Sequence, residues 1–221
     1  MKLLALDTAT EACTAALWLD GEVHERFESG GQHSERILPM VDALLAEAGL
    51  VPTQLDALAF GRGPGSFTGL RIGAGVVQGL AFGAGLPVVP VSSLAALAQG
   101  QDAVKVLAAF DARMRQVYWG VYVRNAKGLM ELQGTEGVFS PLLIPIPEGA
   151  GWHGAGPGWD AYHSDLRQHM GSSLAGWQPL CFPRARHVAE LGAAALRAGH
   201  AVAAEEALPV YIRNDVAIKQ R

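Results

Sequence analysis

Cysteine, net charge and targeting signals are all scarce in this chain. Only two of its 221 residues are cysteines, Cys13 and Cys181, which form no metal-spaced pair, and such low cysteine usage is typical of a reducing compartment. The net charge is −4 with no long run of either sign, whereas a free-standing nucleic-acid binder needs a basic surface. The first apolar run is too short for a signal peptide. We therefore expect a cytoplasmic protein that does not bind nucleic acid by itself.

Long apolar segments are also few, and one of them needs an explanation. No charged residue occurs between Ile72 and Gln101, a length sufficient to span a bilayer. However, Pro87 and Pro90 interrupt this segment, and its glycines lower its hydrophobicity. A buried helix followed by a buried strand explains the pattern better than a transmembrane span, so we expect no membrane association.

The segment from Gly61 to Gly85 organises the rest of the chain. Its first residues, GRGPG, exclude regular structure, so the segment predicts a strand end, a tight loop and then a helix with Ser66 as N-cap. Glycines recur at every fourth position in two stripes, 65, 69 and 73, and then 75, 79 and 83. Each glycine inside a helix costs up to about 1 kcal/mol relative to alanine. We therefore expect another backbone to approach these stripes closely, either within this chain or from a partner.

Apolar periodicity and turn residues predict the remaining elements. The expected strands are 2–7, 12–19, 23–28, 55–61 and 88–91, and the expected helices are 34–48, 92–98, 160–170 and 186–198. Pro39 falls inside one of these helices and predicts a kink or a loose first turn. Residues 141–159 are rich in proline and glycine and predict mostly loops with a short strand, and LPVYIR at 208–213 predicts a final short strand or docking segment.

The second half of the chain repeats part of the first. The segment Leu3–Leu19 can be laid over Leu107–Val123 without a gap, which places Asp7 on Asp111 and Trp18 on Tyr122. Both copies then read as strand, aspartate turn, strand, and each aspartate ends a strand, where open α/β sheets bind ligands. We interpret the repeat as a duplication and predict that the two aspartates face one cleft.

Motifs for nucleotide or metal chemistry are incomplete. The glycine-rich loop matches neither the phosphate-binding pattern G-x-x-x-x-G-K-[ST] nor G-x-G-x-x-G, and the seven histidines include no H-E-x-x-H. Asp7 and Asp111 are able to hold Mg²⁺ and a nucleotide between two lobes. Alternatively, each carboxylate caps its own turn. The residues alone leave both interpretations open.

Several segments together resemble the TsaB (YeaZ) family: LLALDTAT, QHSERILPMVDALLAEAGL, FGRGPGSFTGLRIGAGVVQGLA, VPVSSLAAL, AAFDARMRQVYWGVY and LPVYIR. The likeness covers nearly all of residues 1–125 and is weaker over 126–207. It implies an α/β fold of the actin, sugar-kinase and Hsp70 (ASKHA) type, with two duplicated lobes of mixed sheets flanked by helices. The implied divisions are 1–103, 104–207 and a C-terminal tail, 208–221, which packs back on the first lobe.

The resemblance implies a non-catalytic subunit for threonylcarbamoylation of adenosine 37 in tRNAs. The catalytic relative, TsaD, carries two metal-binding histidines after the equivalent strand, and this chain has Ser93 and Leu97 there. Phosphate loops of the superfamily read Asp-x-Gly, whereas both aspartate turns here lack the glycine. We therefore expect no cofactor and no metal. An active nucleotide-dependent transferase or kinase of the superfamily is the alternative, and a glycoprotease-like peptidase is ranked last.

The resemblance also implies partners and a docking surface. The expected partners are TsaD, the ATPase TsaE and, for the free chain, a second copy, with tRNA contacted only through the complex. Two helices of the first lobe are expected to form the interface, through Leu38, Val41, Leu45, Ser66, Gly69, Ile72, Gly73 and Val76. A degenerate nucleotide or anion site is expected at Asp7, Thr8, Thr10, Asp111 and Arg113.

Overall fold

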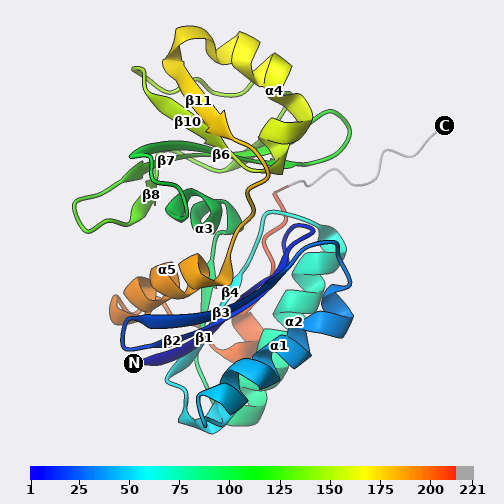
Figure 1. The fold of residues 1–221 in the computed structure, drawn as a ribbon, viewed down its shortest axis with the longest axis vertical. Coiled ribbons are helices and arrows are strands. Elements are labelled where there is room, and N and C mark those ends of the chain that lie inside the picture. The colour runs from blue at the N-terminus through cyan, green and yellow to red at the C-terminus, as the bar shows by residue number, and fades with distance from the viewer. Residues whose placement is uncertain (213–221) are drawn as a thin grey trace, which may run out of the picture.

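The first lobe is built on a five-stranded sheet. The computed structural model describes residues 1–212, and the sheet order is β3-β2-β1-β4-β5 (Figure 1). Its strands are β1 (Lys2–Asp7), β2 (Cys13–Leu19), β3 (Glu22–Glu28), β4 (Ala57–Gly61) and β5 (Val88–Val91). The central strand β1 is almost entirely apolar because helices cover both faces of the sheet. The edge strand β3 is mostly polar, as expected for a strand that faces solvent.

The second lobe repeats this arrangement. Its sheet has the order β11-β10-β6-β7-β8, with β9 paired to β7 outside this path. The strands are β6 (Lys105–Asp111), β7 (Val117–Arg124), β8 (Met130–Leu132), β9 (Gly137–Phe139), β10 (Trp152–Ala155) and β11 (Leu174–Gln178). In both lobes the central strand pairs antiparallel with the strand that follows it and parallel with a later one. The expected two-lobed α/β fold is therefore confirmed.

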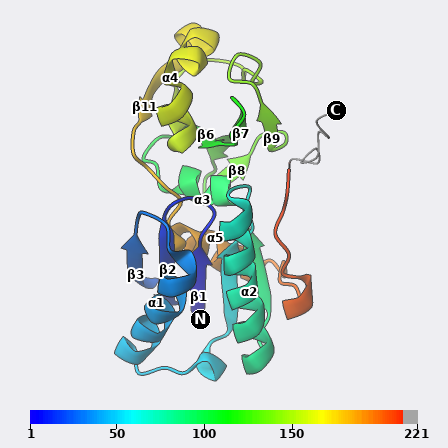
Figure 2. The same cartoon turned by 90° about the vertical axis from the view of Figure 1, so that its right-hand side faces the viewer.

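Helices cover the two sheets as layers (Figures 1 and 2). Helices α1 (His33–Glu47) and α2 (Phe67–Ala84) lie side by side on one face of the first sheet, and α5 (Ala185–Arg197) lies on the other. Helix α4 (Pro157–Met170) packs on the second sheet, and α3 (Ser93–Gln99) lies between the second sheet and α5. Short 3-10 turns occur at Pro52–Gln54, Gly171–Ser173 and Ala204–Glu206. Within residues 1–212, no helix is both long and apolar enough to cross a membrane.

Helix α5 departs from the expected division of the chain. Its residues fall within 104–207, the range assigned to the second lobe, yet Val188 and Ala189 pack against Leu3 and Ala5 of β1. The N-terminus of α5 is held by the same lobe, because the Arg186 amide donates to the Glu25 carboxylate of β3 at 3.2 Å. The chain thus crosses from the second lobe back to the first after β11, which its apolar pattern alone could not reveal.

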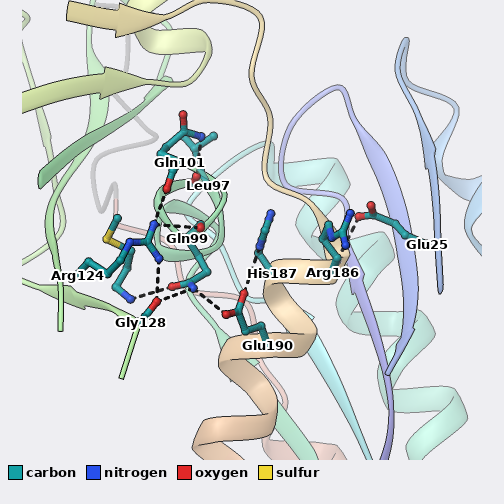
Figure 3. Close-up of polar contacts among 10 residues, drawn as sticks. Glu25, Leu97, Gln99, Gln101, Arg124, Gly128, Arg186, His187 and Glu190 are labelled. Carbon is teal, nitrogen blue, oxygen red and sulfur yellow. Dashed lines mark hydrogen bonds and ion pairs between the residues drawn. The ribbon is translucent and has the colours of Figure 1, made fainter. Parts of the chain in front are cut away.

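A polar junction joins α3, α5 and the second sheet (Figure 3). The buried Gln99 amide donates to the Gly128 carbonyl and to Glu190 of α5, both at 3.0 Å, and accepts from the Met130 amide at 2.8 Å. The Arg124 guanidinium donates to the same Gly128 carbonyl at 2.8 Å. Because a buried amide without partners would be costly, this arrangement stabilises one relative placement of the three elements.

The expected overlay of the two halves is wrong by one residue in its second strand. Leu3 pairs with Trp18, but Leu107 pairs with Val121 and not with Tyr122. The turn between β6 and β7 is therefore one residue shorter than the turn between β1 and β2. A one-residue slip moves every side chain of a strand to the other face, so Trp18 and Tyr122 are not equivalent.

Elements of the first half lie close to their expected ranges, whereas β8, β9 and β11 of the second half had no expected range. The region around Pro39 also differs from expectation. Helix α1 runs without a break from His33 to Glu47, although it contains Pro39. The kink expected there is absent among its described dihedrals, and the break lies instead in α4, where Tyr162 has φ −132° and ψ 25°. Residues 208–212 form no strand, and Arg213 with the rest of the expected C-terminal segment lies outside the described residues.

Candidate functional surface and inter-lobe site

The loop before α2 is held tightly by short polar contacts. The Ser66 hydroxyl accepts the Gly69 amide at 3.3 Å, which confirms Ser66 as the N-cap. The Ser66 amide in turn donates to the Ala9 carbonyl at 2.7 Å, and the Thr8 hydroxyl donates to the Gly69 carbonyl at 2.8 Å. The turn after β1 and the start of α2 therefore form one unit.

The first glycine stripe packs inside the lobe. A Cβ atom at Gly65 would lie 2.2 Å from the Ala9 carbonyl oxygen, and one at Gly69 would lie 2.0 Å from the Thr8 carbonyl oxygen. At Gly73 it would lie 2.5 Å from the Thr8 hydroxyl oxygen. No Cβ fits at such distances, so these glycines allow the backbone of the β1–β2 turn to approach α2. The helix stability that these three glycines cost is therefore offset by close packing within this chain.

The second glycine stripe has no such explanation. A Cβ atom at Gly75, Gly79 or Gly83 would have nothing within 4 Å, and all three residues are exposed. The neighbouring Phe82 side chain is 84% exposed. Helix α2 therefore presents a row of glycines without side chains to the outside, beside a large apolar ring. The contacts of residues 1–212 give no reason for glycine at these positions.

The expected interface residues differ in their exposure. Val41 and Leu45 belong to the core between α1 and the first sheet, and Gly69 and Gly73 lie against Thr8. These four positions are buried within the lobe. Of the other expected interface residues, Leu38 and Ser66 are exposed, and Ile72 and Val76 are half-buried.

Asp7 is completely enclosed at the end of β1. Its Oδ1 accepts the Ala9 amide at 2.8 Å and its Oδ2 accepts the Ser93 hydroxyl at 2.7 Å. A Cβ atom at Gly61 would lie only 1.8 Å from Asp7 Oδ2, so glycine is needed there to admit the carboxylate. Burial raises the pKa of Asp7 to about 6, although both hydrogen bonds favour the charged form.

Asp111 ends β6 in the same way but in different surroundings. Its Oδ1 accepts the Arg113 amide at 2.8 Å and the Tyr162 hydroxyl at 3.1 Å. Its Oδ2 lies 3.2 Å from the Arg113 guanidinium, which is 87% exposed, while the Asp111 side chain is 24% exposed. Both aspartates therefore cap their own turns through the amide two residues later.

The two aspartates do not face one cleft, contrary to the expectation from the repeat. Asp7 contacts Ser93 of α3 and shares its side of β1 with Leu3 and Ala5, which pack against α5. Asp111 contacts Tyr162 of α4 and lies on the side of β6 that α4 covers. The Thr8 hydroxyl is bound to the Gly69 carbonyl of α2, and the Thr10 hydroxyl accepts the Ala12 amide within the first turn. These residues do not assemble a nucleotide or anion site in this structure.

The two positions where a metal-binding relative carries histidine have other roles. Ser93 is buried and donates to Asp7, and the Leu97 side chain lies in an apolar cluster with Phe110 and Tyr122. Among residues 1–212, no group of three histidine, cysteine, aspartate or glutamate side chains is placed to hold a metal ion. A hydroxyl committed to a carboxylate and an aliphatic side chain are poor ligands for the metals that imidazole binds.

A second polar cluster, which sequence reasoning missed, lies between the lobes. The hydroxyls of Ser92 and Tyr122 both donate to Glu136, and the Arg62 guanidinium lies 3.9 Å from the same carboxylate. Burial, followed by the nearby Glu136 charge, raises the pKa of Tyr122 well above its ordinary value, so this hydroxyl stays a donor. No sequence pattern links these four residues, because each belongs to a different loop or strand.

One pocket of about 770 Å³ lies where the two lobes and α5 meet, with Glu11, Phe27, Gln101, Cys181, Arg184 and His187 in its wall. Two of its polar side chains already have carboxylate partners, since Arg184 lies 2.8 Å from Glu25 and His187 lies 3.4 Å from Glu190. Burial raises the pKa of Cys181 to about 11, so its thiol stays protonated near neutral pH. The pocket therefore contains no activated nucleophile.

Two lobes with the same strand order, joined by helices, define a duplicated α/β protein of the ASKHA type. The family model for TsaD, tRNA N6-adenosine threonylcarbamoyltransferase, matches residues 27–138. A curated relative, the tRNA threonylcarbamoyladenosine biosynthesis protein TsaB of Escherichia coli, is 45% identical and aligns over 100% of this chain and 98% of its own length. The Haemophilus influenzae TsaB is 42% identical over 100% of this chain and 97% of its own.

Solved structures agree with the sequence relatives. YeaZ from Pseudomonas aeruginosa has a TM-score of 0.88 and 46% identity, and the match covers 95% of this chain and 99% of that one. This chain therefore belongs to the TsaB (YeaZ) family, whose named relatives are tRNA threonylcarbamoyladenosine biosynthesis proteins.

Proposed function

We propose that this chain is a non-catalytic subunit for threonylcarbamoylation of adenosine 37 in tRNAs that read codons beginning with A. It binds and supports TsaD, together with the ATPase TsaE, in the cytoplasm. Transfer RNA meets the chain only through this complex, and the free chain pairs with a second copy through the same face. Family membership supports the pathway, because the full-length relatives carry that name.

The outward glycine row of α2 is the observation that carries the docking part of this proposal. Gly75, Gly79 and Gly83 weaken the helix although a Cβ atom there would meet nothing within 4 Å, unlike Gly69 and Gly73, which pack against the β1–β2 turn. A helix without side chains along one row lets a second helix pack closely against it. Phe82, next to Gly83 on α2, and Leu38 on the neighbouring helix α1 are exposed apolar side chains of the same helical layer. The docking face is therefore this outer layer, and the inner stripe is excluded from it.

The proposal that the chain is non-catalytic is supported by the residues at the positions where the resemblance implies metal-binding histidines and a phosphate loop. Ser93 and Leu97 are committed to Asp7 and to the apolar core, respectively. The Asp7 carboxylate has two protein donors and no solvent access, which leaves no room for a phosphate or a hydrated cation beside it. These contacts support a chain that acts through binding and leaves group transfer to its partner.

The test compares two glycines of one helix, Gly79→Leu and Gly73→Leu. In the first variant the leucine extends into open space, so the melting temperature should stay close to that of the native chain. Binding to TsaD from the same organism should weaken by roughly 10- to 100-fold, because an inserted side chain separates two packed helices. Calorimetric titration and a tRNA modification assay that omits each component in turn measure both effects.

Gly73→Leu is the matched control. Its side chain would overlap the Thr8 hydroxyl and approach Leu6, so the variant should lose folded structure and not only partner binding. Normal TsaD affinity in a folded Gly79→Leu variant would exclude this docking face. Failure of the native chain to bind TsaD at all would instead contradict the proposed function itself.

An active nucleotide-dependent transferase or kinase is the second candidate, and the match to the TsaD family model over residues 27–138 favours it. The two candidates differ in what the purified chain binds. An enzyme of this class binds ATP and a divalent cation by itself, whereas the subunit should show neither in equilibrium dialysis. Stoichiometric binding of both would favour the enzyme.

A further inference from the structure

Three side chains from distant parts of the chain form a cluster at the first turn of α2. The Arg71 guanidinium carbon lies 3.8 Å from the centre of the Phe67 ring, and Arg71 Nε donates to the Tyr211 hydroxyl at 3.3 Å. The rings of Phe67 and Tyr211 have their centres 5.4 Å apart. Each member therefore contacts the other two, and we call Phe67, Arg71 and Tyr211 the aromatic–arginine cluster.

The C-terminal segment is held in place for this contact. The Gln78 side chain of α2 donates to the Ala207 carbonyl at 3.2 Å, and the Val210 amide donates to the Arg62 carbonyl at 2.8 Å. Figure 2 shows this segment running beside α2 after the last 3-10 turn. Two backbone anchors on either side of Leu208 thus bring Tyr211 to α2, so the cluster is preorganised before any partner arrives.

The cluster is exposed although its members are large. Phe67 is 54% exposed, Tyr211 is 43% exposed, and the nearby Leu208 is 59% exposed. Folding of this lobe therefore gains only part of the apolar area that these side chains offer. Tyrosine and arginine are the residues that most often carry the binding energy of protein interfaces.

Arg71 carries an uncompensated charge within the part of the chain that the structure describes. It is the single charged residue of α2, and no carboxylate among residues 1–212 lies within ion-pair distance of it. Phe67 covers one face of the guanidinium and Tyr211 takes Nε, which leaves the two Nη groups without a bond to these residues. A planar guanidinium held in this way matches the two oxygens of a carboxylate.

We propose that the aromatic–arginine cluster anchors an acidic side chain of the protein that docks on α2, an inference that rests on the proposed function. The partner's carboxylate accepts from the Arg71 Nη groups, and the apolar part of the same side chain covers the rings of Phe67 and Tyr211. A phosphate backbone fits this surface less well, because nucleic acid is bound by several cations together and α2 has one. The C-terminal segment thereby becomes part of the docking face.

The experiment uses the full chain and TsaD from the same organism. Arg71→Met removes the charge but keeps the length of the side chain, and it should weaken binding by about 10- to 100-fold. Arg71→Lys should recover only part of the loss, because an ammonium group cannot form the paired contact. Tyr211→Phe keeps the ring and removes the bond to Arg71, and it should weaken binding by a few-fold. Arg167→Met, an exposed arginine of α4, is the control and should have no effect.

The outcomes separate this inference from the proposed function. If the native chain does not bind TsaD, both the proposed function and the anchor at the aromatic–arginine cluster are wrong. If the native chain binds and folded Arg71→Met binds within twofold of it, the anchor alone is wrong. The anchor is equally wrong if Arg71→Met keeps TsaD binding and loses only tRNA binding or self-association. Native binding that weakens as salt is added, together with Arg71→Met binding that changes less with salt, supports the carboxylate contact.

Discussion

The turns after β1 and β6 begin alike and end differently. Both follow the central strand of a sheet, and in both an aspartate accepts the amide two residues later. The first turn is buried against Gly61 and the start of α2, whereas the second carries an arginine into solvent and contacts α4. In both lobes the aspartate keeps the same hydrogen bond to the amide two residues later. The neighbouring elements, which differ between the lobes, decide whether its carboxylate is buried or partly exposed.

The largest effect that separates the two turns should come from Gly61→Ala. The added Cβ would lie 1.8 Å from Asp7 Oδ2 and 2.7 Å from the Ser93 hydroxyl, and neither atom has room to move. We expect a loss of several kcal/mol of stability, because overpacking and a broken buried hydrogen bond act together. Chemical denaturation measures it. The matched change in the second sheet is Gly176→Ala, where nothing lies within 4 Å, and it should be close to neutral. Equal losses of stability in Gly61→Ala and Gly176→Ala would contradict the burial of Asp7 against Gly61.

The pH dependence of stability should differ between the two aspartates. The pKa of Asp7 is about 6 in the folded chain against an ordinary value of 3.8, so the unfolded chain loses its proton first as the pH rises. The free energy of unfolding is therefore highest below about pH 4, where Asp7 is protonated in both states. It falls by about 3 kcal/mol as the pH rises through 6 and the buried carboxyl must ionise. In Asp7→Asn this loss should disappear, because the amide carries no charge: its oxygen still accepts the Ala9 amide, and its NH2 group can donate to the Ser93 oxygen.

Asp111→Asn is the control for this measurement. Its carboxylate is partly exposed and paired with Arg113, so the variant should keep the decline of the native chain between pH 4 and pH 7. Thermal unfolding in a series of buffers gives the three profiles. A native profile that is flat between pH 4 and pH 7 would show that burial does not govern Asp7.

Local features of this fold could be predicted from sequence, and contacts between distant segments could not. The start of α2 at Ser66 could be predicted, because an N-cap and the glycine-rich loop before it depend on only a few neighbouring residues. The two glycine stripes were visible, but their different surroundings depend on the β1–β2 turn, which lies far away in sequence. Periodicity identifies an apolar face without saying what covers it, and four of the expected docking positions are buried within the lobe. The contact between Arg71 and Tyr211 and the return of α5 to the first sheet had no local signal at all.

The smallest effect concerns backbone strain in the second turn. Arg113, Met114 and Arg115 have φ values of 60°, 52° and 55°, three successive non-glycine residues in the left-handed region. This conformation costs roughly 1–2 kcal/mol per residue for most side chains and less for asparagine. Because Met114 is 72% exposed, Met114→Asn should raise stability by about 0.5–1 kcal/mol, measured by denaturant unfolding. Glu11→Asn tests the same exchange in the first turn, where residue 11 is exposed and has no positive φ, and it should bring no gain. A gain at both positions would point to a general effect of asparagine, whereas a gain at Met114 alone places the strain in the shorter second turn.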